Sequence, residues 1–447
     1  MKKNIRPVTL LSLGYLITIL LGTILLMLPI ASNSGEMTSF IDSLFTATSA
    51  TCVTGLVVAD TYATWTMFGQ IVIIVLIQIG GLGFMTIITL LFMLFKKNIG
   101  IFNRTVLMQS AGSFNISEVT VLLKRIIIGT FLFEGIGAMI LTFAFSKQMP
   151  ISQAIYYGIF HSISAFCNAG FDIFGAKGGS LTGFADNYLV LTTLMCLIII
   201  GGTGFIVWSD LIDSKFKFKK FQLHTKMVIV FNTLLIVIPA ALFFISEFTK
   251  INPNYSAYDF TIGEKILNSF FLSVSPRTAG FNTVSLTSLN SSSKLLTIIL
   301  MFIGGNSGST AGGLKVTTFI VILANLISIA RGNEKVVLFK RKVDDKIIKQ
   351  SSALFIVYLA TTILATLIIT TIENFTLEEV LFEITSAIAT VGLSVGISAG
   401  AKYAITKLLI IFLMYAGRLG ALALFSVFVK RKNEYVLEQP KGRILVG

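Results

Sequence analysis

Four short polar segments of this 447-residue chain end in a glycine at nearly constant spacing. Successive glycines are 115, 110 and 112 residues apart. Glycine adopts backbone angles that other residues avoid, so it can turn its carbonyl group into a cavity. Rings of backbone carbonyls replace the hydration shell of a cation. The chemistry predicted here is ion coordination by the segments Val53-Thr54-Gly55, Asn168-Ala169-Gly170, Thr278-Ala279-Gly280 and Thr390-Val391-Gly392.

A second glycine-rich cluster follows each segment. Its last glycine lies 28, 34, 28 and 28 residues after the segment glycine, taken in chain order. Three equal offsets and one insertion favour four homologous units in tandem. The clusters are Gly80-Gly81-Leu82-Gly83, Gly201-Gly202-Thr203-Gly204, Gly304-Gly305-Asn306-Ser307-Gly308 and Ala416-Gly417-Arg418-Leu419-Gly420.

The elements that position these segments are predicted to be membrane helices. The chain is 54% hydrophobic and 13% charged, with a mean hydropathy of +0.87. A soluble protein carries about 25% charged residues. Val8 to Gly35 contains no charge and exceeds the roughly 20 residues that a membrane span needs. It has no clear cleavage site, so it is interpreted as a retained first helix rather than a signal peptide.

The distribution of basic residues predicts the topology. Twenty-five of the 35 Lys and Arg fall in five clusters separated by apolar runs. Basic loops stay in the cytoplasm, so both termini are predicted to be cytoplasmic. The net charge of +14 is then mainly a topology signal. Attraction to anionic membrane lipid is a secondary interpretation, and no nucleic-acid partner is expected. The clusters are Lys2–Arg6, Lys96–Arg125, Lys215–Lys226, Arg331–Lys349 and Lys430–Arg443.

The predicted fold is an all-α integral membrane protein. Four tandem helix–pore-loop–helix units, with eight transmembrane helices and four half-helices, surround one pseudo-fourfold pore. The units are residues 1–100, 101–215, 216–335 and 336–430, followed by a cytoplasmic tail, 431–447. Their outer helices are predicted at Val8–Ser32 and Thr66–Phe95, Leu122–Phe145 and Asn187–Leu211, Thr225–Ile245 and Lys294–Ala330, and Ser351–Ile372 and Lys402–Val429.

A short helix is predicted before each polar segment. Thr376 is followed three residues later by Glu379, a capping-box pattern. Ser152 and Thr261 are also expected helix caps, the latter followed by Glu264. The C-terminal end of such a half-helix carries partial negative charge, which favours a cation. The four half-helices are Ser39–Ser49, Ser152–Ser164, Gly263–Ser273 and Leu377–Ser386.

The third unit departs from this pattern. Its second apolar stretch, Leu295–Ala330, is 36 residues long with one charge, Lys315. Its glycine-rich middle cannot form a stable helix and cannot face lipid. We expect a mobile loop that gates the pore; a rigid helix break is the alternative. The gate residues are Gly304, Gly305, Asn306, Ser307, Gly308, Ser309, Thr310, Ala311, Gly312, Gly313, Lys315 and Arg418.

Three charged residues lie within apolar surroundings. Arg418 is costly in a span and therefore expected to be functional, by lining the pore, repelling cations or anchoring the loop. The alternative is a structural pairing with helix-end carbonyls or with Glu134. Glu134 is interpreted as a buried packing residue. Arg277 is expected to point away from the pore and to pair with Glu264 or Asp259.

The remaining acidic residues fall in or near the predicted outer loops and half-helices. They either concentrate cations at the outer mouth or form a solvated rim, and the sequence leaves both open. They are Glu36, Asp42, Asp60, Asp172, Asp186, Glu247, Asp259, Glu264, Glu373, Glu378, Glu379 and Glu383.

The sequence offers little support for enzymatic chemistry. The two histidines, His161 and His224, are far apart, and no cluster has metal-ligand spacing. No phosphate-binding loop motif occurs. The cysteines, Cys52, Cys167 and Cys196, are interpreted as buried thiols. The chain is therefore expected not to be an enzyme and to bind no cofactor of its own.

Together these features resemble the Trk/Ktr/HKT superfamily of potassium transporters. The resemblance covers about Val8 to Gly447 and rests on one glycine per unit, a glycine-rich loop in the third unit and an arginine in the fourth. The short N-terminus looks most like KtrB, the membrane subunit of the bacterial Ktr potassium uptake system. The resemblance implies that Gly55, Gly170, Gly280 and Gly392 are filter glycines, and four glycines go with potassium selectivity in this family.

The resemblance also implies partners and regulation. Gly304–Gly313 matches the family's intramembrane gating loop, and Arg418 matches the arginine beneath the filter. Such proteins are homodimers in the plasma membrane, work with a cytoplasmic ring of KtrA regulator subunits that bind ATP or ADP, and are often enhanced by sodium. Potassium is then the transported ion, coordinated by filter carbonyls.

A sodium- or proton-coupled cation symporter remains the alternative function. Symporters often contain inverted repeats and charges at the membrane midplane. Here the repeats run in parallel, since each begins and ends at a basic cluster, and buried acids are nearly absent.

Overall fold

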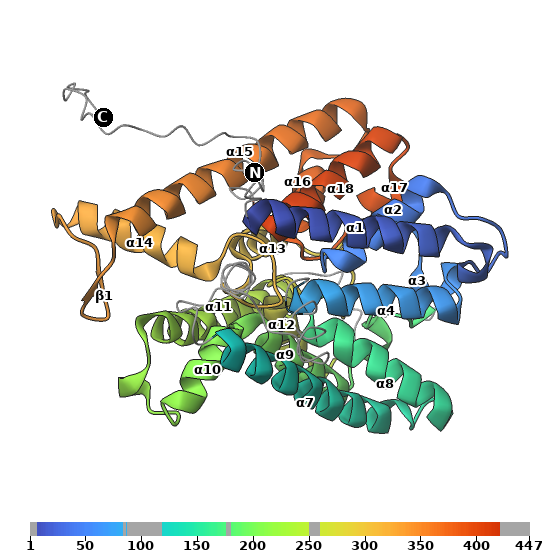
Figure 1. Cartoon of the computed structure of the whole chain (residues 1–447), viewed down its shortest axis with the longest axis horizontal. Helices are drawn as coiled ribbons and strands as arrows, with labels where there is room; N and C mark the ends of the chain where they lie inside the picture. The colour runs from blue at the N-terminus through green and yellow to red at the C-terminus, as the bar shows by residue number, and fades with distance from the viewer. Residues whose placement is uncertain (1–6, 84–85, 87–118, 176–179, 250–259, 421–447) are drawn as a thin grey trace, which may run out of the picture.

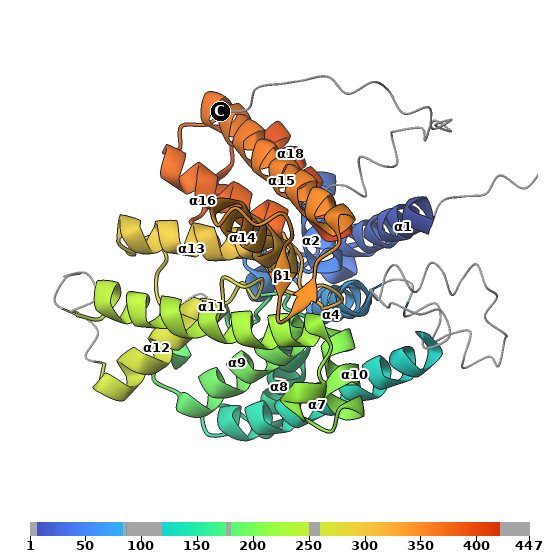
Figure 2. The ribbon, with the colours of Figure 1, turned by 90° about the vertical axis from the view of Figure 1, so that its left-hand side faces the viewer.

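The computed structural model describes residues 7–83, 86, 119–175, 180–249 and 260–420, and their regular secondary structure is almost entirely helical (Figure 1). The strands described are β1 (Val337–Leu338) and β2 (Arg341–Lys342), an antiparallel pair in which Val337 lies opposite Lys342. Helices of consecutive units lie side by side around a common centre (Figure 2).

In the first unit, α1 (Pro7–Met27) and α4 (Met67–Leu82) both pack against the short helix α2 (Phe40–Thr51). The connections contain the 3-10 turn η1 (Pro29–Ala31) and the one-turn helix α3 (Thr61–Thr64). The continuous helix predicted at Thr66–Phe95 is wrong, because α4 ends at Leu82 and Gly83 is left-handed with φ +84°. Most of the predicted remainder lies outside the described residues.

The second unit contains a bend that the sequence did not predict. Its helices are α7 (Val119–Phe145), α8 (Ile151–Phe166), the 3-10 turn η3 (Thr182–Phe184), α9 (Tyr188–Thr203) and α10 (Phe205–Asp213). The continuous helix predicted at Asn187–Leu211 is wrong, because α9 and α10 meet at 88°. Gly204, with φ +105°, forms the corner, a conformation that residues with a β-carbon rarely adopt.

The third unit begins after the 3-10 turn η4 (Phe218–Lys220) and contains α11 (Leu223–Glu247) and α12 (Ile262–Val274). Its second apolar stretch is divided into α13 (Ser291–Ile303) and α14 (Val316–Ala330). The predicted helix break is therefore confirmed, and it covers Gly304 to Lys315.

The fourth unit consists of α15 (Asp345–Ile372), α16 (Leu377–Ala389), α17 (Ile397–Gly400) and α18 (Ala404–Leu419). α16 packs against α13, α15 and α18, so it lies among helices of two units. The continuous helix predicted at Lys402–Val429 is wrong, because α18 ends at Leu419 and Gly420 is left-handed with φ +86°. Residues 421–429 lie outside the described part of the chain.

A helix occupies each of the four segments predicted as half-helices. Capping boxes join Thr261 to Glu264 and Thr376 to Glu379, as predicted. The prediction that Ser152 caps a helix is wrong. α8 starts one residue before Ser152, its N-cap residue is Pro150, and no side chain forms a capping hydrogen bond. Proline suits this position because its fixed φ allows helix entry without an N–H to satisfy.

By length and composition, four described helices can each cross a membrane, α1, α7, α11 and α15, and the bent pair α9–α10 passes as a fifth. Each of these opens a unit except the bent pair. The second helices of the units are shorter or interrupted, because each contains a glycine-rich cluster. The eight spans predicted from sequence therefore stay a prediction.

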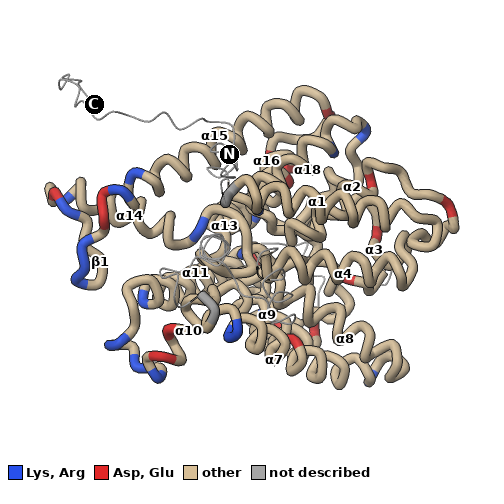
Figure 3. The backbone as a smooth tube through the Cα atoms, in the orientation of Figure 1, with Lys and Arg blue, Asp and Glu red and all other residues tan. Residues whose placement is uncertain are grey.

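Charged residues gather at the two ends of the molecule along its long axis (Figure 3). Lys and Arg concentrate at the end that carries β1 and the turn between α10 and α11, whereas most acidic residues lie elsewhere. Between these ends large apolar side chains remain exposed, including Leu21, Ile24, Phe131 and Ile356. An exposed apolar surface between polar ends is the surface that a bilayer requires.

Candidate ion-binding site

The four segment glycines meet in a closed ring, in chain order. A β-carbon built on Gly55 would lie 3.2 Å from the Cα of Gly170, and one on Gly170 would lie 2.9 Å from that of Gly280. The corresponding distances are 3.2 Å from Gly280 to Gly392 and 2.9 Å from Gly392 back to Gly55. Residues up to 337 positions apart in sequence thus touch, and only glycine fits at each contact.

The backbone of the ring repeats one unusual conformation four times. The glycines have φ of 91°, 69°, 80° and 94°, and the residue two positions before each is also left-handed. Left-handed non-glycine residues are uncommon and cost about 1–3 kcal/mol. The residues between them are not left-handed, so the same alternation of conformations occurs in all four segments. The left-handed residues are Val53 (57°), Asn168 (58°), Thr278 (70°) and Thr390 (51°).

Several buried side-chain oxygens at the ring have no hydrogen-bond partner in the described part of the chain. They belong to Thr54, Asn168, Thr278 and Thr390. All four residues are fully buried. Buried polar atoms are normally paired, so these oxygens are free to face water or an ion. The fit to a monovalent cation is good, because the site combines main-chain and neutral side-chain oxygens.

A serine behind each segment holds it in place. The hydroxyls of Ser49 and Ser386 accept hydrogen bonds from the N–H groups of Gly55 and Gly392, both at 3.1 Å. Ser164 instead donates to the carbonyl of Phe171, at 2.7 Å.

In the third unit Ser275 donates to the carbonyl of Phe281. This role of the serines was not predicted, although their positions in the sequence contain a signal for it. The serine stands six residues before the glycine in three units and five residues before it in the third.

The second glycine clusters let helices approach the ends of the half-helices. A β-carbon on Gly80, Gly201 or Gly417 would overlap the main-chain carbonyl of Thr51, Phe166 or Ile388, respectively. Each of those carbonyls lies four residues before a ring glycine. The third unit differs, because Gly305 faces Ala311 of its own loop instead.

The loop between α13 and α14 is bonded to the second unit. Thr310 Oγ1 accepts from the amide of Asn168 at 2.9 Å and donates to the carbonyl of Phe166 at 3.2 Å. The Asn306 amide donates to the carbonyl of Gly202 at 2.8 Å. The loop also touches the fourth unit, since a β-carbon on Gly312 would overlap the Thr390 hydroxyl. It therefore crosses next to the ring residues that precede the glycines.

Arg418 joins the loop to the first unit. Its guanidinium donates to the carbonyls of Thr310 and Gly80. Lys315 donates to carbonyls within the loop itself, those of Ala311 at 2.7 Å and Gly312 at 3.1 Å. Arg418 therefore makes both of the contacts that were considered for it. It bonds the loop at Thr310, and it bonds a helix-end carbonyl at Gly80.

Glu134 does not pair with Arg418, so that alternative is wrong. Its carboxylate accepts from Gln78 at 3.2 Å and lies 3.8 Å from the thiol of Cys167. Cys52 and Cys167 are buried as predicted, whereas Cys196 is exposed.

Arg277 also has a different partner from those predicted. It is buried and donates to the side-chain oxygen of Asn232 on α11. Glu264 is unavailable because it caps α12 through Thr261. Asp259 lies outside the described residues.

Glu383 was predicted among the acids of the outer loops and half-helices, but its side chain is fully buried. Its carboxylate accepts hydrogen bonds from the N–H groups of Val395 and Ser398, at 3.1 and 3.0 Å. The hydroxyls of Ser394 and Ser398 donate to it as well. It thereby fixes the segment that follows Gly392.

This geometry, four related helical units with a glycine ring, defines a cation-transport fold. Residues 13–437 match the TrkH family, described as cation transport proteins, and the chain belongs to that family. Membership of the Trk/Ktr/HKT superfamily, as predicted, is confirmed.

Relatives of known name align with this chain over nearly its full length. The potassium/sodium uptake protein NtpJ of Enterococcus hirae is 38% identical, covering 100% of this chain and 98% of that protein. The Ktr system potassium uptake protein B of Bacillus subtilis is 38% identical, covering 99% of this chain and 97% of that protein. The crystal structure of the potassium transporter TrkH from Vibrio parahaemolyticus shares the fold, with a TM-score of 0.70 and 18% identity over 96% of this chain and 86% of that one.

Proposed function

We propose that this chain takes up potassium across the plasma membrane through a channel-like pore. The closed ring of Gly55, Gly170, Gly280 and Gly392 is the observation that carries the proposal. Potassium would exchange its water shell for the carbonyls of the four segments, and the unpaired oxygens beside them would assist. The names of the relatives, a potassium/sodium uptake protein and a potassium uptake protein, both include potassium and so support it as the ion.

The half-helices would provide the favourable field for a cation. α2, α8, α12 and α16 each end just before a ring segment. A helix C-terminus carries a partial negative charge, and four of them converging on one point stabilise an ion between them. The membrane potential then drives the cation inward, at about 2.3 kcal/mol per charge for each 100 mV.

The loop Gly304–Gly313, with Lys315 and Arg418, is the proposed gate. Its bonds to the second unit and its contact with Thr390 support this role, because an obstacle in that position lies across the path from the ring. Removal of the obstacle requires the bonds of Thr310 to break, so gating would be a rearrangement of a few named contacts.

The proposed assembly follows the resemblance. It comprises four units at 1–100, 101–215, 216–335 and 336–430, a cytoplasmic tail at 431–447, and both termini in the cytoplasm. The chain would form a homodimer and bind a KtrA-like ring that carries ATP or ADP, with sodium enhancing uptake. The name of the B. subtilis relative, a Ktr system protein, supports a partner system.

Potassium rescue tests the proposal. A cell that lacks its potassium uptake systems should grow at low potassium when it expresses this chain, and growth should improve when a regulator subunit is co-expressed. Absence of rescue with both subunits in the membrane would contradict the proposal. Uptake that requires a sodium or proton gradient even when the membrane potential is held constant would favour the coupled symporter instead.

A further inference from the structure

The turn between α10 and α11 combines exposed aromatic and basic side chains. Phe216 is 74% exposed and Phe218 is 46% exposed. Ile212, at the end of α10, is 54% exposed. Four lysines alternate with or follow the two phenylalanines, and all are exposed. We call this surface the foot; it consists of Ile212, Lys215, Phe216, Lys217, Phe218, Lys219 and Lys220.

The foot lies where a membrane surface would be. α11 starts at Leu223 and is long and apolar enough to cross a membrane, so residues just before it stand at the boundary. α10 turns by 88° from α9, so if α9 crosses the membrane, α10 runs along its surface. Under the proposed topology, on which this inference rests, this is the cytoplasmic surface.

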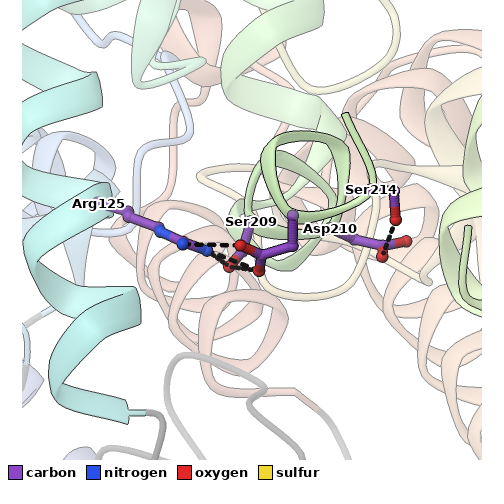
Figure 4. A network of polar contacts seen from close by, with 5 residues as sticks. Arg125, Ser209, Asp210 and Ser214 are labelled. Atoms are coloured by element: carbon purple, nitrogen blue, oxygen red, sulfur yellow. Dashed lines mark hydrogen bonds and ion pairs between the residues drawn. The ribbon is translucent and has the colours of Figure 1, made fainter. Parts of the chain in front are cut away.

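The two carboxylates near the foot, Asp210 and Asp213, accept hydrogen bonds from residues outside its set of lysines. The carboxylate of Asp213 accepts one hydrogen bond from each of the two terminal guanidinium nitrogens of Arg125, both at 2.8 Å. Arg125 also bonds Ser209, and Ser214 donates to Asp210 (Figure 4). Asp210 accepts the N–H of Gln222 as well, at 2.9 Å. Among the described residues, no ion pair joins a lysine of the foot to a carboxylate.

The geometry points to the foot as a binding surface for anionic phospholipid of the cytoplasmic leaflet. Phenylalanine on a segment that lies in the interface is buried at the boundary between headgroups and acyl chains, and lysines beside it attract anionic lipid. Neither residue type alone selects a lipid surface. Their alternation beside a membrane helix favours lipid over an acidic protein, which would leave the exposed phenylalanines in water.

The foot is connected to the proposed gate through α10. The N–H of Phe205, the first residue of α10, donates to the carbonyl of Gly308 in the loop at 2.7 Å. The other end of α10 is held to α7 by Arg125. Lipid bound at the foot would therefore bias the position of α10 and, through Phe205, that of the loop.

Depth-dependent quenching tests the inference. The purified full chain carrying Phe216→Trp is reconstituted into vesicles of phosphatidylcholine mixed with brominated phosphatidylglycerol. We expect the introduced indole to be quenched, and quenching to need more anionic lipid when Lys217→Gln and Lys219→Gln are added. The shift should be about fivefold in lipid concentration for each lysine removed. Lys346→Gln with Lys349→Gln, which removes two exposed lysines from α15, is the control and should cause no shift.

Two outcomes overturn the inference. An indole that stays exposed to water at every lipid composition excludes a lipid contact. An indole that becomes shielded only after a regulator subunit is added assigns the foot to a protein partner. Because quenching is read without any ion flux, a failure of the proposed potassium uptake leaves this test unaffected.

Discussion

Arg418 donates a hydrogen bond to the main-chain carbonyl of Thr310, and the two residues belong to different units. The same guanidinium donates to the carbonyl of Gly80 at the end of α4. One side chain of the fourth unit thus joins the loop of the third unit to a helix end of the first. Arginine suits this role because it presents five donors in one plane.

Arg418→Ala should alter transport kinetics. Its loss leaves buried carbonyls unpaired, at about 1–3 kcal/mol each, and frees the loop from the first unit. We expect roughly a tenfold change in the maximal rate of potassium uptake or in the half-saturating concentration. Arg331→Ala, at the exposed end of α14, is the control. Wild-type kinetics in a stably expressed Arg418→Ala protein would make Arg418 a structural residue only.

Deletion of Gly304–Gly313 should increase flux, because it removes the segment that crosses next to Thr390 and Asn168. The measurement is potassium efflux from vesicles that contain the purified protein. Thr310→Val is a milder version: it retains the loop but removes the hydrogen bond to Asn168. Unchanged or lost flux in folded deletion protein would contradict the gate.

Gly392→Ser should lower the preference for potassium over sodium. Gly392 is left-handed, with φ +94°, and a β-carbon there would overlap the carbonyl of Thr54. Gly396→Ser is a matched control, since Gly396 has φ +105° but nothing lies within 4 Å of its β-carbon position. Backbone strain is then common to both variants, and only Gly392→Ser deforms the ring. Equal selectivity in the two variants would refute the filter assignment.

Glu383→Gln should weaken the outer part of the fourth segment. Glutamine has one acceptor oxygen in place of two, so a donor among Val395, Ser394 and Ser398 loses its partner, at about 1–3 kcal/mol. We expect lower thermal stability together with a lower potassium preference. Glu378→Gln, a partly exposed neighbour 3.8 Å from Lys294, should change neither. A stability loss with unchanged selectivity would limit Glu383 to a folding role.

We expect potassium uptake to depend on external pH through the carboxyl group of Asp172. It lies two residues beyond Gly170, and burial raises its pKa to about 6. Because a carboxyl with a raised pKa is neutral below that pH and anionic above it, attraction of cations is lost as the pH falls through about 6. Uptake at limiting potassium should fall over this range in the wild type and stay flat in Asp172→Asn. Asp186→Asn, in the exposed neighbouring loop, should keep the wild-type profile; identical profiles in all three proteins would exclude Asp172.

The sequence was sufficient for features that depend on local chemistry. The capping boxes at Thr261 and Thr376, the helices before the segments and the irregular stretch from Gly304 all follow from residue types within a few positions. Repetition added the equivalence of Gly55, Gly170, Gly280 and Gly392. The TrkH family match then agrees with the resemblance that these features supported.

Features that depend on distant contacts could not be predicted. Arg418 meets Thr310 across 108 residues, and nothing near either residue specifies the other. Glu383 looked like a rim acid because its partners lie 11 to 15 residues later, in a segment without regular structure. The glycine clusters were expected to lie within continuous helices, but α4, α9 and α18 each end at a left-handed glycine, Gly83, Gly204 and Gly420. The angle of 88° after Gly204 depends on contacts far from it in sequence.

The most direct test of the account is the reversal potential of the purified full chain in a planar bilayer. With only a potassium gradient present, the current should reverse near the potassium equilibrium potential. That reversal should not move when a sodium or proton gradient is imposed, since conduction through a carbonyl ring needs no coupled ion. A reversal potential that moves away from the potassium equilibrium potential when the sodium or proton gradient is changed would contradict a potassium-selective pore that conducts without a coupled ion.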